Sequence, residues 1–234
     1  MKPIQPDEYD RLSPSDAVLL QKQLRQQIDL TPSNNTIRLI GGADISFNKF
    51  EETVYAGIVI LKYPEMIPVE STSVISQTRF PYISGLLAFR EIPALLKAWE
   101  QLVVKPDMMV LDGQGIAHKR RLGIATHFGL LTDVPSVGCA KSRLTGTYTE
   151  PANAQFAESP LMDKEEQIGV VFKSKINCKP LFISPGHKIS LSQSVEIIKN
   201  CIRKYRMPEP TRLAHNLVNE TRVAAKSGTD NKLL

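Results

Sequence analysis

Three strand-like runs in succession constrain the fold of this chain more than any other feature. Residues 37–45 (IRLIGGADI) and 55–63 (YAGIVILKY) are apolar and rich in β-branched side chains, and residues 69–78 alternate polar and apolar positions. Runs of this kind are typical of β-strands, and only short turns separate the three. The pattern therefore predicts an antiparallel meander near the start of the chain.

The period of the pattern changes after residue 85, where helical and strand-like segments alternate. Short strands are predicted over residues 108–111, 136–139, 167–172 and 179–184, and helices over residues 86–102, 122–131, 192–205 and 210–225. A helix over about residues 14–30 precedes the meander, a polar stretch at 149–164 receives no element, and a disordered tail is expected over about 227–234. Alternating elements imply parallel pairing, so we expect one α/β domain over residues 1–234, a mixed sheet flanked by helices.

Composition narrows the class of protein. The 234 residues are 42% hydrophobic and 23% charged, as in soluble globular domains, and the net charge of +5 permits a polyanionic partner without requiring one. Cys139, Cys178 and Cys201 form neither a CxxC pair nor an even-numbered set, which disfavours a disulfide framework and a cysteine-rich zinc site. No signal peptide and no run of roughly 18 apolar residues is found, so we expect a cytoplasmic protein with no membrane partner. We also expect a monomer.

Acidic residues occupy unusual places in two of the predicted strands. Asp44 lies within the apolar run GGADISF, and Asp112 ends the short strand in MMVLDGQG. A buried acid is costly unless it is paired, protonated or bound to a metal, whereas Asp44 on the solvent face and Asp112 as a simple turn residue are the alternatives. Glu91 lies in the predicted helix that begins near residue 86, where glutamates are usually solvated. If the three carboxylates converge, they form an oxygen site for Mg²⁺ that is suited to phosphoryl transfer.

Basic, imidazole and aromatic residues lie near the same elements. His118 opens a basic run after the Asp112 turn, and Lys141 follows a predicted strand, where it is suited to hold a phosphate or else belongs to a solvated face. His215 on the last predicted helix is a candidate metal ligand or water-positioning base, or a structural histidine. Tyr82 follows a proline in a strand-to-helix loop, where it can enter a base stack or pack against the core.

Five segments, in the expected order, resemble the endonuclease V family of deoxyinosine-specific endonucleases: FPYISGLLAFRE, DGQGIAHKRRLGIATHFG, GCAKSRL, FISPGHKIS and PEPTRLAHNLVNE. The resemblance extends from residue 37 to about residue 223. It implies an RNase H-like fold and dependence on Mg²⁺, for which Mn²⁺ can substitute. By this resemblance the catalytic, metal-binding carboxylates are Asp44, Glu91 and Asp112. His215 matches a histidine near the second metal position, and His118 and Lys141 match residues around the scissile backbone.

The resemblance also implies how a base would be recognised. The family's wedge motif Pro-Tyr-Ile-Pro appears here as Pro81, Tyr82, Ile83 and Ser84, so the last position differs. The pocket for a flipped hypoxanthine would be lined by Gly85, Leu87, Gly113, Gly115, Gly123, Ile124 and Leu144. Backbone groups in such a pocket reject adenine, because its donors and acceptors are reversed and buried polar groups would stay unpaired.

The activity implied is hydrolysis of the second phosphodiester bond 3′ to deoxyinosine in DNA. An inosine-specific ribonuclease would use the same metal site, and the preference for DNA rests on the likeness to bacterial members of the family. A protein that only binds nucleic acid would be expected to lack at least one of the three acids, and all three are present.

Overall fold

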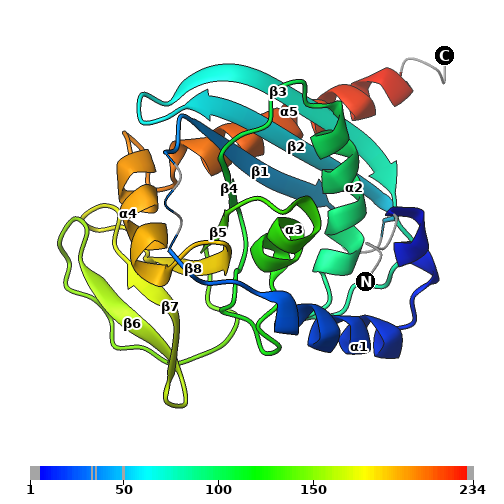
Figure 1. The fold of residues 1–234 in the computed structure, drawn as a ribbon. Coiled ribbons are helices and arrows are strands. Elements are labelled where there is room, and N and C mark those ends of the chain that lie inside the picture. Colours follow the sequence, from blue (N-terminus) through cyan, green and yellow to red (C-terminus); the bar gives the residue numbers. More distant parts are fainter. Residues whose placement is uncertain (1–5, 33, 35, 49–50, 231–234) are drawn as a thin grey trace.

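A mixed sheet of eight strands runs through the computed structural model, which describes residues 6–32, 34, 36–48 and 51–230 (Figure 1). In the order in which they lie side by side, the strands are β3 (Ile67–Gln77), β2 (Thr53–Lys62), β1 (Leu39–Phe47), β4 (Met108–Leu111), β5 (Ser136–Ala140), β8 (Leu181–His187), β7 (Glu166–Phe172) and β6 (Glu158–Asp163). Strands β1, β2 and β3 pair antiparallel in succession, which confirms the predicted meander. Strands β1, β4 and β5 pair in parallel, as the alternating elements predict.

Helices cover both faces of this sheet. They are α1 (Pro14–Leu24), α2 (Ala88–Gln101), α3 (Ile124–Thr132), α4 (Leu191–Cys201) and α5 (Glu209–Asp230), with 3-10 turns η1 (Pro6–Arg11) and η2 (Arg25–Gln27). The core on one face joins η1, α1, α2 and α3, and the core on the other joins α4 and α5 (Figure 1). The predicted mixed α/β fold of the RNase H-like type is confirmed. None of the helices in the described ranges is long and apolar enough to cross a membrane.

Strand β4 explains why a central segment of the sequence shows no alternation. Met109 and Leu111 belong to the core beneath α2 and α3, whereas Met108 and Val110 belong to the core beneath α4 and α5. A parallel strand between two layers of helices is buried on both sides, so every position of β4 is apolar. The first polar residue after this strand is Asp112, which lies just beyond the carboxyl end of β4.

Four predicted elements or boundaries are wrong. The N-terminal helix ends at Leu24 and a 3-10 turn follows, because the next segment leaves helical geometry to bond with the end of β8. The polar stretch 149–164 contains β6, an edge strand in which Leu161 is the buried residue, so its apolar pattern is too weak to identify it. The fourth helix ends at Cys201 because Ile202 turns to extended backbone. The expected tail begins as the last turn of α5, which continues to Asp230, and residues 231–234 lie outside the described residues.

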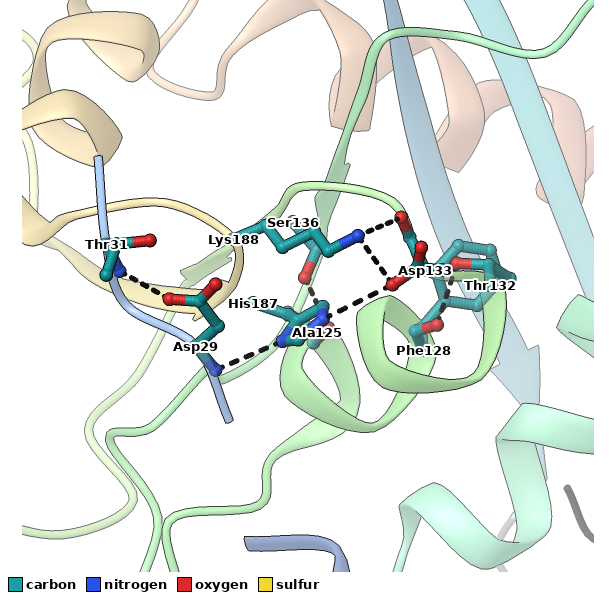
Figure 2. Close-up of polar contacts among 9 residues, drawn as sticks. All are labelled: Asp29, Thr31, Ala125, Phe128, Thr132, Asp133, Ser136, His187 and Lys188. Atoms are coloured by element: carbon teal, nitrogen blue, oxygen red, sulfur yellow. Dashed lines mark hydrogen bonds and ion pairs between the residues drawn. The ribbon is translucent and has the colours of Figure 1, made fainter. Parts of the chain in front are cut away.

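The segment after α1 is fixed by a polar cluster, here called the Asp133 cluster, which consists of Asp29, Asp133, His187 and Lys188 (Figure 2). The Asp29 N–H donates to His187 Nδ1 over 3.3 Å, and the Lys188 N–H donates to the Asp29 carbonyl over 2.7 Å. Lys188 Nζ forms an ion pair of 2.6 Å with Asp133, the residue that ends α3 in the left-handed region at φ 57°. The cluster thus joins the N-terminal segment, α3 and β8.

Candidate active site

Two aspartates lie side by side near the carboxyl ends of two neighbouring strands of the sheet. Ala43 of β1 pairs with Leu111 of β4, so Asp44 and Asp112 come next on neighbouring parallel strands. The Asp112 N–H donates to the Ala43 carbonyl over 3.1 Å. The side chains of Asp44 and Asp112 are 9% and 10% exposed, so the alternative in which Asp44 points to solvent is wrong.

Glu91 joins the two aspartates from the first turn of α2. Burial raises the pKa of Glu91 to about 7, and the charges of Asp44 and Asp112 act in the same direction. Burial also raises the pKa of Asp44, and the charge of Asp112 adds to the effect. Strand pairing puts Asp44 beside Asp112, and Glu91 lines the same cavity as Asp112, so the three residues share one region, here called the carboxylate site. Negative charge is costly there and a cation would be stabilised.

His215 of α5 holds one member of the carboxylate site. Its Nδ1 lies 2.7 Å from Asp44 Oδ2, and its Nε2 lies 2.9 Å from the amide nitrogen of Asn219. An amide N–H can only donate, so Nε2 accepts and Nδ1 carries the proton that is directed at Asp44. Helix α5 can come this close because residue 42 is glycine. A Cβ at this position would lie 2.0 Å from the Pro210 carbonyl oxygen. Both ring nitrogens are engaged here, and ligation of a metal by His215 stays a prediction.

Lys141, the first residue after β5, forms an ion pair with Asp112. Its ammonium group and the His215 N–H therefore lie where a cation would neutralise Asp112 and Asp44. Within the described ranges, no three His, Cys, Asp or Glu side chains are already drawn together as a set of metal ligands. The chemistry of the donors still fits Mg²⁺, because this ion prefers carboxylate oxygens and keeps several of its waters.

A cavity of about 370 Å³ opens beside the carboxylate site, and Glu91 and Asp112 are among its lining residues. Six of the residues predicted to form the base pocket line it, namely Gly85, Leu87, Gly113, Gly123, Ile124 and Leu144. Gly115 does not line this cavity. Its N–H donates to Ser184 over 2.8 Å, and a Cβ there would lie 2.1 Å from the Pro185 carbonyl oxygen. Gly115 therefore permits close packing of the turn against β8.

His118 lines the cavity as a neutral imidazole. Its Nε2 donates to the Gly85 carbonyl over 3.0 Å, and its Nδ1 accepts from the Arg120 N–H over 3.1 Å. Burial, followed by the charge of Arg120, lowers the pKa of His118 to about 4. The ring is therefore uncharged near neutral pH and supports the loop at Gly85. Its predicted place beside the scissile backbone stays a prediction.

The Gly85 carbonyl receives two further donors, one of them from the N-terminal helix. Arg120 Nη2 donates to it over 2.8 Å, and Gln21 Nε2 donates over 3.1 Å. Gln21 is fully buried, and its Oε1 also accepts from Arg120 Nε. Gly85 adopts φ +80°, a conformation that favours glycine. Helix α1 thus fixes one wall of a cavity that lies far from it in the sequence.

The segment predicted to be a wedge motif lies in the loop between β3 and α2, beside the same cavity. Tyr82 is 43% exposed, and its ring centroid lies 6.0 Å from that of Phe47. Pro81 is also exposed, Ile83 packs partly against the core, and Ser84 lines the cavity. The motif therefore combines an exposed aromatic tip with an anchored end.

The family model for endonuclease V matches residues 22–216 of this chain, which is most of its length. The chain belongs to the endonuclease V family. An endonuclease V from Dictyoglomus thermophilum is 48% identical over 200 residues, with 86% of this chain and 87% of the relative covered. The structure of endonuclease V from Bacillus subtilis has a TM-score of 0.90 at 27% identity and covers 97% of this chain and 100% of its own. Endonuclease V from Ciona intestinalis, in complex with a 24mer DNA containing an inosine followed by a ribo-adenosine, has a TM-score of 0.78 at 26% identity and covers 90% and 98%.

Two residues at the candidate site escape sequence reasoning. Gln114 lines the cavity, and its Nε2 donates to the Ser142 carbonyl over 2.8 Å, which joins the segments after β4 and β5. Nothing in its turn sequence distinguishes it from a solvated polar residue. Gln21 does leave a signal, because it interrupts the buried stripe of α1 between Leu20 and Leu24. A polar residue on an apolar stripe indicates a specific partner.

Proposed function

We propose that this chain is a metal-dependent endonuclease that recognises deoxyinosine in DNA and hydrolyses the second phosphodiester bond 3′ to it, with Mg²⁺ as cofactor and Mn²⁺ as a substitute. Membership of the endonuclease V family supports the nuclease chemistry, and the Ciona intestinalis relative was solved with inosine-containing DNA. The observation that carries the proposal is the position of the carboxylate site. Glu91, whose pKa is raised by burial and then by the charges of the two aspartates, lines the same cavity as the predicted base-binding residues.

Asp44, Glu91 and Asp112 would hold the metal, which would supply an activated water and neutralise charge on the transferred phosphoryl group. The chain's own residues prepare the site. The Nδ1–H of His215 orients Asp44. The Lys141 side chain is 42% exposed, so its ammonium group can reach a backbone phosphate while it stays close to Asp112.

Recognition of the base rests on the cavity and the wedge loop. Hypoxanthine carries a carbonyl and a ring N–H where adenine has an amine and a ring acceptor. Gly85, Gly113 and Gly123 line the cavity, and a pocket that pairs with hypoxanthine through backbone groups would leave buried polar groups unpaired with adenine. Tyr82 is exposed at the tip of its loop and would fill the gap that an extruded base leaves in the stack.

The test is cleavage of three matched oligonucleotides: a duplex DNA with one inosine, the same duplex with adenine, and an RNA with one inosine. Each is incubated with Mg²⁺, with Mn²⁺ or with EDTA, and the products are mapped at single-nucleotide resolution. We expect one cut at the second bond 3′ to deoxyinosine, with either metal and not with EDTA. Equal cleavage of the adenine duplex would contradict the proposal, preferred cleavage of RNA would favour the ribonuclease, and binding without cleavage would favour a binding protein.

A further inference from the structure

A second cavity, here called the lysine groove, opens next to the carboxylate site and has no role in the function proposed above. It measures about 610 Å³, and its lining includes Lys141, Tyr148, Lys173 and Lys179. Lys141 also lines the base cavity and pairs with Asp112. The two cavities therefore meet at the residue that contacts the carboxylate site.

Strand pairing places the lysine groove at the same ends of the strands as the carboxylate site. Ala140, at the end of β5, pairs with Phe182 near the start of β8, and Leu181 pairs with Phe172, the last residue of β7. The successive strands β4, β5, β8 and β7 are thus each flanked, at the same end of the sheet, by one charged residue: Asp112, Lys141, Lys179 and Lys173 in that order. Three inter-strand steps of about 4.8 Å give a path of roughly 14 Å. Measured along the axis of a duplex, this length corresponds to roughly four base steps, at about 3.4 Å of axial rise per phosphate of one strand.

The charge and shape of the lysine groove suit a polyanion. Three lysines and one acid, Glu150, line it, and Glu150 lies 3.6 Å from Lys173. Arg206 adds positive charge beside the groove, where it donates to the carbonyls of the lining residues Lys179, Pro180 and Lys141 at 2.7, 2.7 and 3.3 Å. These contacts join the segment after β5 to the segment before β8, so they fix two sides of the groove relative to each other.

An aromatic side chain completes the wall of the groove. The ring of Tyr148 packs on Phe182 with centroids 5.6 Å apart, and the guanidinium carbon of Arg143 lies 5.7 Å from the Tyr148 centroid. A fixed aromatic ring beside lysines is the combination that single strands of nucleic acid use for stacking and backbone contact.

We infer that the lysine groove binds the sugar-phosphate backbone of the cleaved strand on the 3′ side of the scissile bond. The inference rests on the proposed function. If the inosine occupies the base cavity and the scissile phosphate lies at Asp112 and Lys141, the strand that continues beyond that phosphate enters the groove. Because the proposed cut is 3′ to the lesion, this continuing strand is the 3′ flank.

Cys178 offers a probe of the groove in the unmodified protein. It lines the groove and is partly exposed, whereas Cys139 and Cys201 are buried. Burial raises the pKa of both buried thiols, to about 12 for Cys201, so an alkylating reagent should modify Cys178 first. Alkylation is followed by mass spectrometry in EDTA, with each oligonucleotide at a concentration that saturates binding as measured by fluorescence anisotropy.

We compare two inosine oligonucleotides of equal length, one with a 3′ flank that passes the scissile bond by at least about six nucleotides and one that ends directly after it. The long flank is expected to slow alkylation of Cys178 several-fold, and the short flank to leave it unchanged. The inference would be overturned if neither oligonucleotide slowed the alkylation of Cys178, or if both slowed it equally. Cleavage of inosine DNA without flank-dependent protection would remove this inference and leave the proposed function standing, whereas an inactive wild type would remove both.

Charge variants test the same groove without chemistry at Cys178. Lys179→Ala should weaken binding of the long-flank oligonucleotide roughly fivefold and lower the slope of log K against log salt by about one. Lys175→Ala is the matched control, because Lys175 lies in the same segment without lining the groove. Glu150→Gln should act in the opposite direction and tighten binding, since it removes the groove's acid and frees Lys173. Identical behaviour of the two lysine variants, or weaker binding by Glu150→Gln, would contradict the inference.

Discussion

The carboxylate site and the Asp133 cluster contain the same kinds of contact and differ in electrostatic state. At the carboxylate site, His215 contacts Asp44 and Lys141 contacts the neighbouring Asp112. In the Asp133 cluster, Lys188 pairs with Asp133 at 2.6 Å and His187 Nε2 lies 3.8 Å from the same carboxylate (Figure 2). Aspartate, histidine and lysine therefore meet in both places.

Burial makes the difference between the two regions. The Asp133 side chain is 76% exposed, and the hydrogen bond from Lys188 lowers its pKa. The Asp44 side chain is 9% exposed, and burial raises its pKa despite the contact with His215. An acid whose charge is already favourable serves to join segments of the fold. An acid whose charge is costly is poised to bind a cation, which is why perturbed acids in a cavity indicate function.

The largest effect is expected from removing one charge in each region. Asp44→Asn should reduce single-turnover cleavage of an inosine duplex by roughly 1,000-fold or more, because charge stabilisation at a metal site is worth several kcal/mol. Asp133→Asn should cleave at the wild-type rate. In thermal unfolding, Asp133→Asn should be the less stable of the two variants because it loses an ion pair. Asp44→Asn should be the more stable one because it relieves repulsion among the acids. Comparable cleavage by the two variants would break the distinction between the regions.

The next effect concerns the substrate side of the carboxylate site. If the exposed Tyr82 ring fills the gap left by an extruded base, Tyr82→Ala should lose about 1 to 3 kcal/mol of stacking, or roughly 5- to 150-fold in binding. The loss should be greater for duplex DNA than for an unstructured single strand, where little stacking is broken. Single-turnover cleavage of both substrates measures it, and Tyr82→Phe should behave as the wild type. Equal losses on both substrates would make Tyr82 a support for the loop.

How far the sequence predicts these regions depends on what makes each one. The strands around Asp44 and Asp112 were predictable, because continuous apolar runs mark buried strands and an acid at their end is conspicuous. The convergence of Glu91 was predictable only through the family resemblance, since a helical glutamate is usually solvated. The Asp133 cluster was not predictable at all. Its contacts join residues 29, 133, 187 and 188, and neither local pattern nor spacing encodes such an encounter.

The supporting residues show the same limit. Gln21 and Arg120 meet at the Gly85 carbonyl across about a hundred positions of sequence, a contact set by how α1 packs. The edge strand β6 was missed for a different reason, because one buried residue in six gives no alternation to detect. Burial on both faces leaves a clear sequence pattern, whereas edges and polar contacts between distant segments do not.

The two regions should also differ in how pH affects stability. The pKa of Glu91 is raised from 4.5 to about 7, so its contribution to stability is complete below pH 4.5 and lost as pH rises through 7. The pKa of Asp133 is lowered from 3.8, so its contribution is present above that value and lost on acidification, and exposure keeps it small. In EDTA, the melting temperature should fall by a few degrees between about pH 5 and pH 8.

The control for this pH effect is Glu91→Gln, which should flatten the decline measured by thermal unfolding. Mg²⁺ should stabilise the wild type more at about pH 8 than at about pH 5, because protons and the metal compete for the same carboxylates. Parallel curves for the wild type and Glu91→Gln would show that Glu91 is ionised throughout this range, and the electrostatic contrast with Asp133 would then rest on Asp44 alone.

The smallest effect separates the two lysines, each of which pairs with an aspartate. Lys141 lies between the carboxylate site and the lysine groove, so Lys141→Ala should weaken binding to inosine-containing and undamaged DNA alike and reduce the slope of log K against log salt by about one. Lys188→Ala should leave that slope unchanged and lower only the melting temperature, because Lys188 bonds Asp133 and the N-terminal segment. Fluorescence anisotropy at a series of salt concentrations measures both. If the two variants give the same slope as the wild type, Lys141 serves to neutralise Asp112, and the two lysines have the same structural role despite the difference in their surroundings.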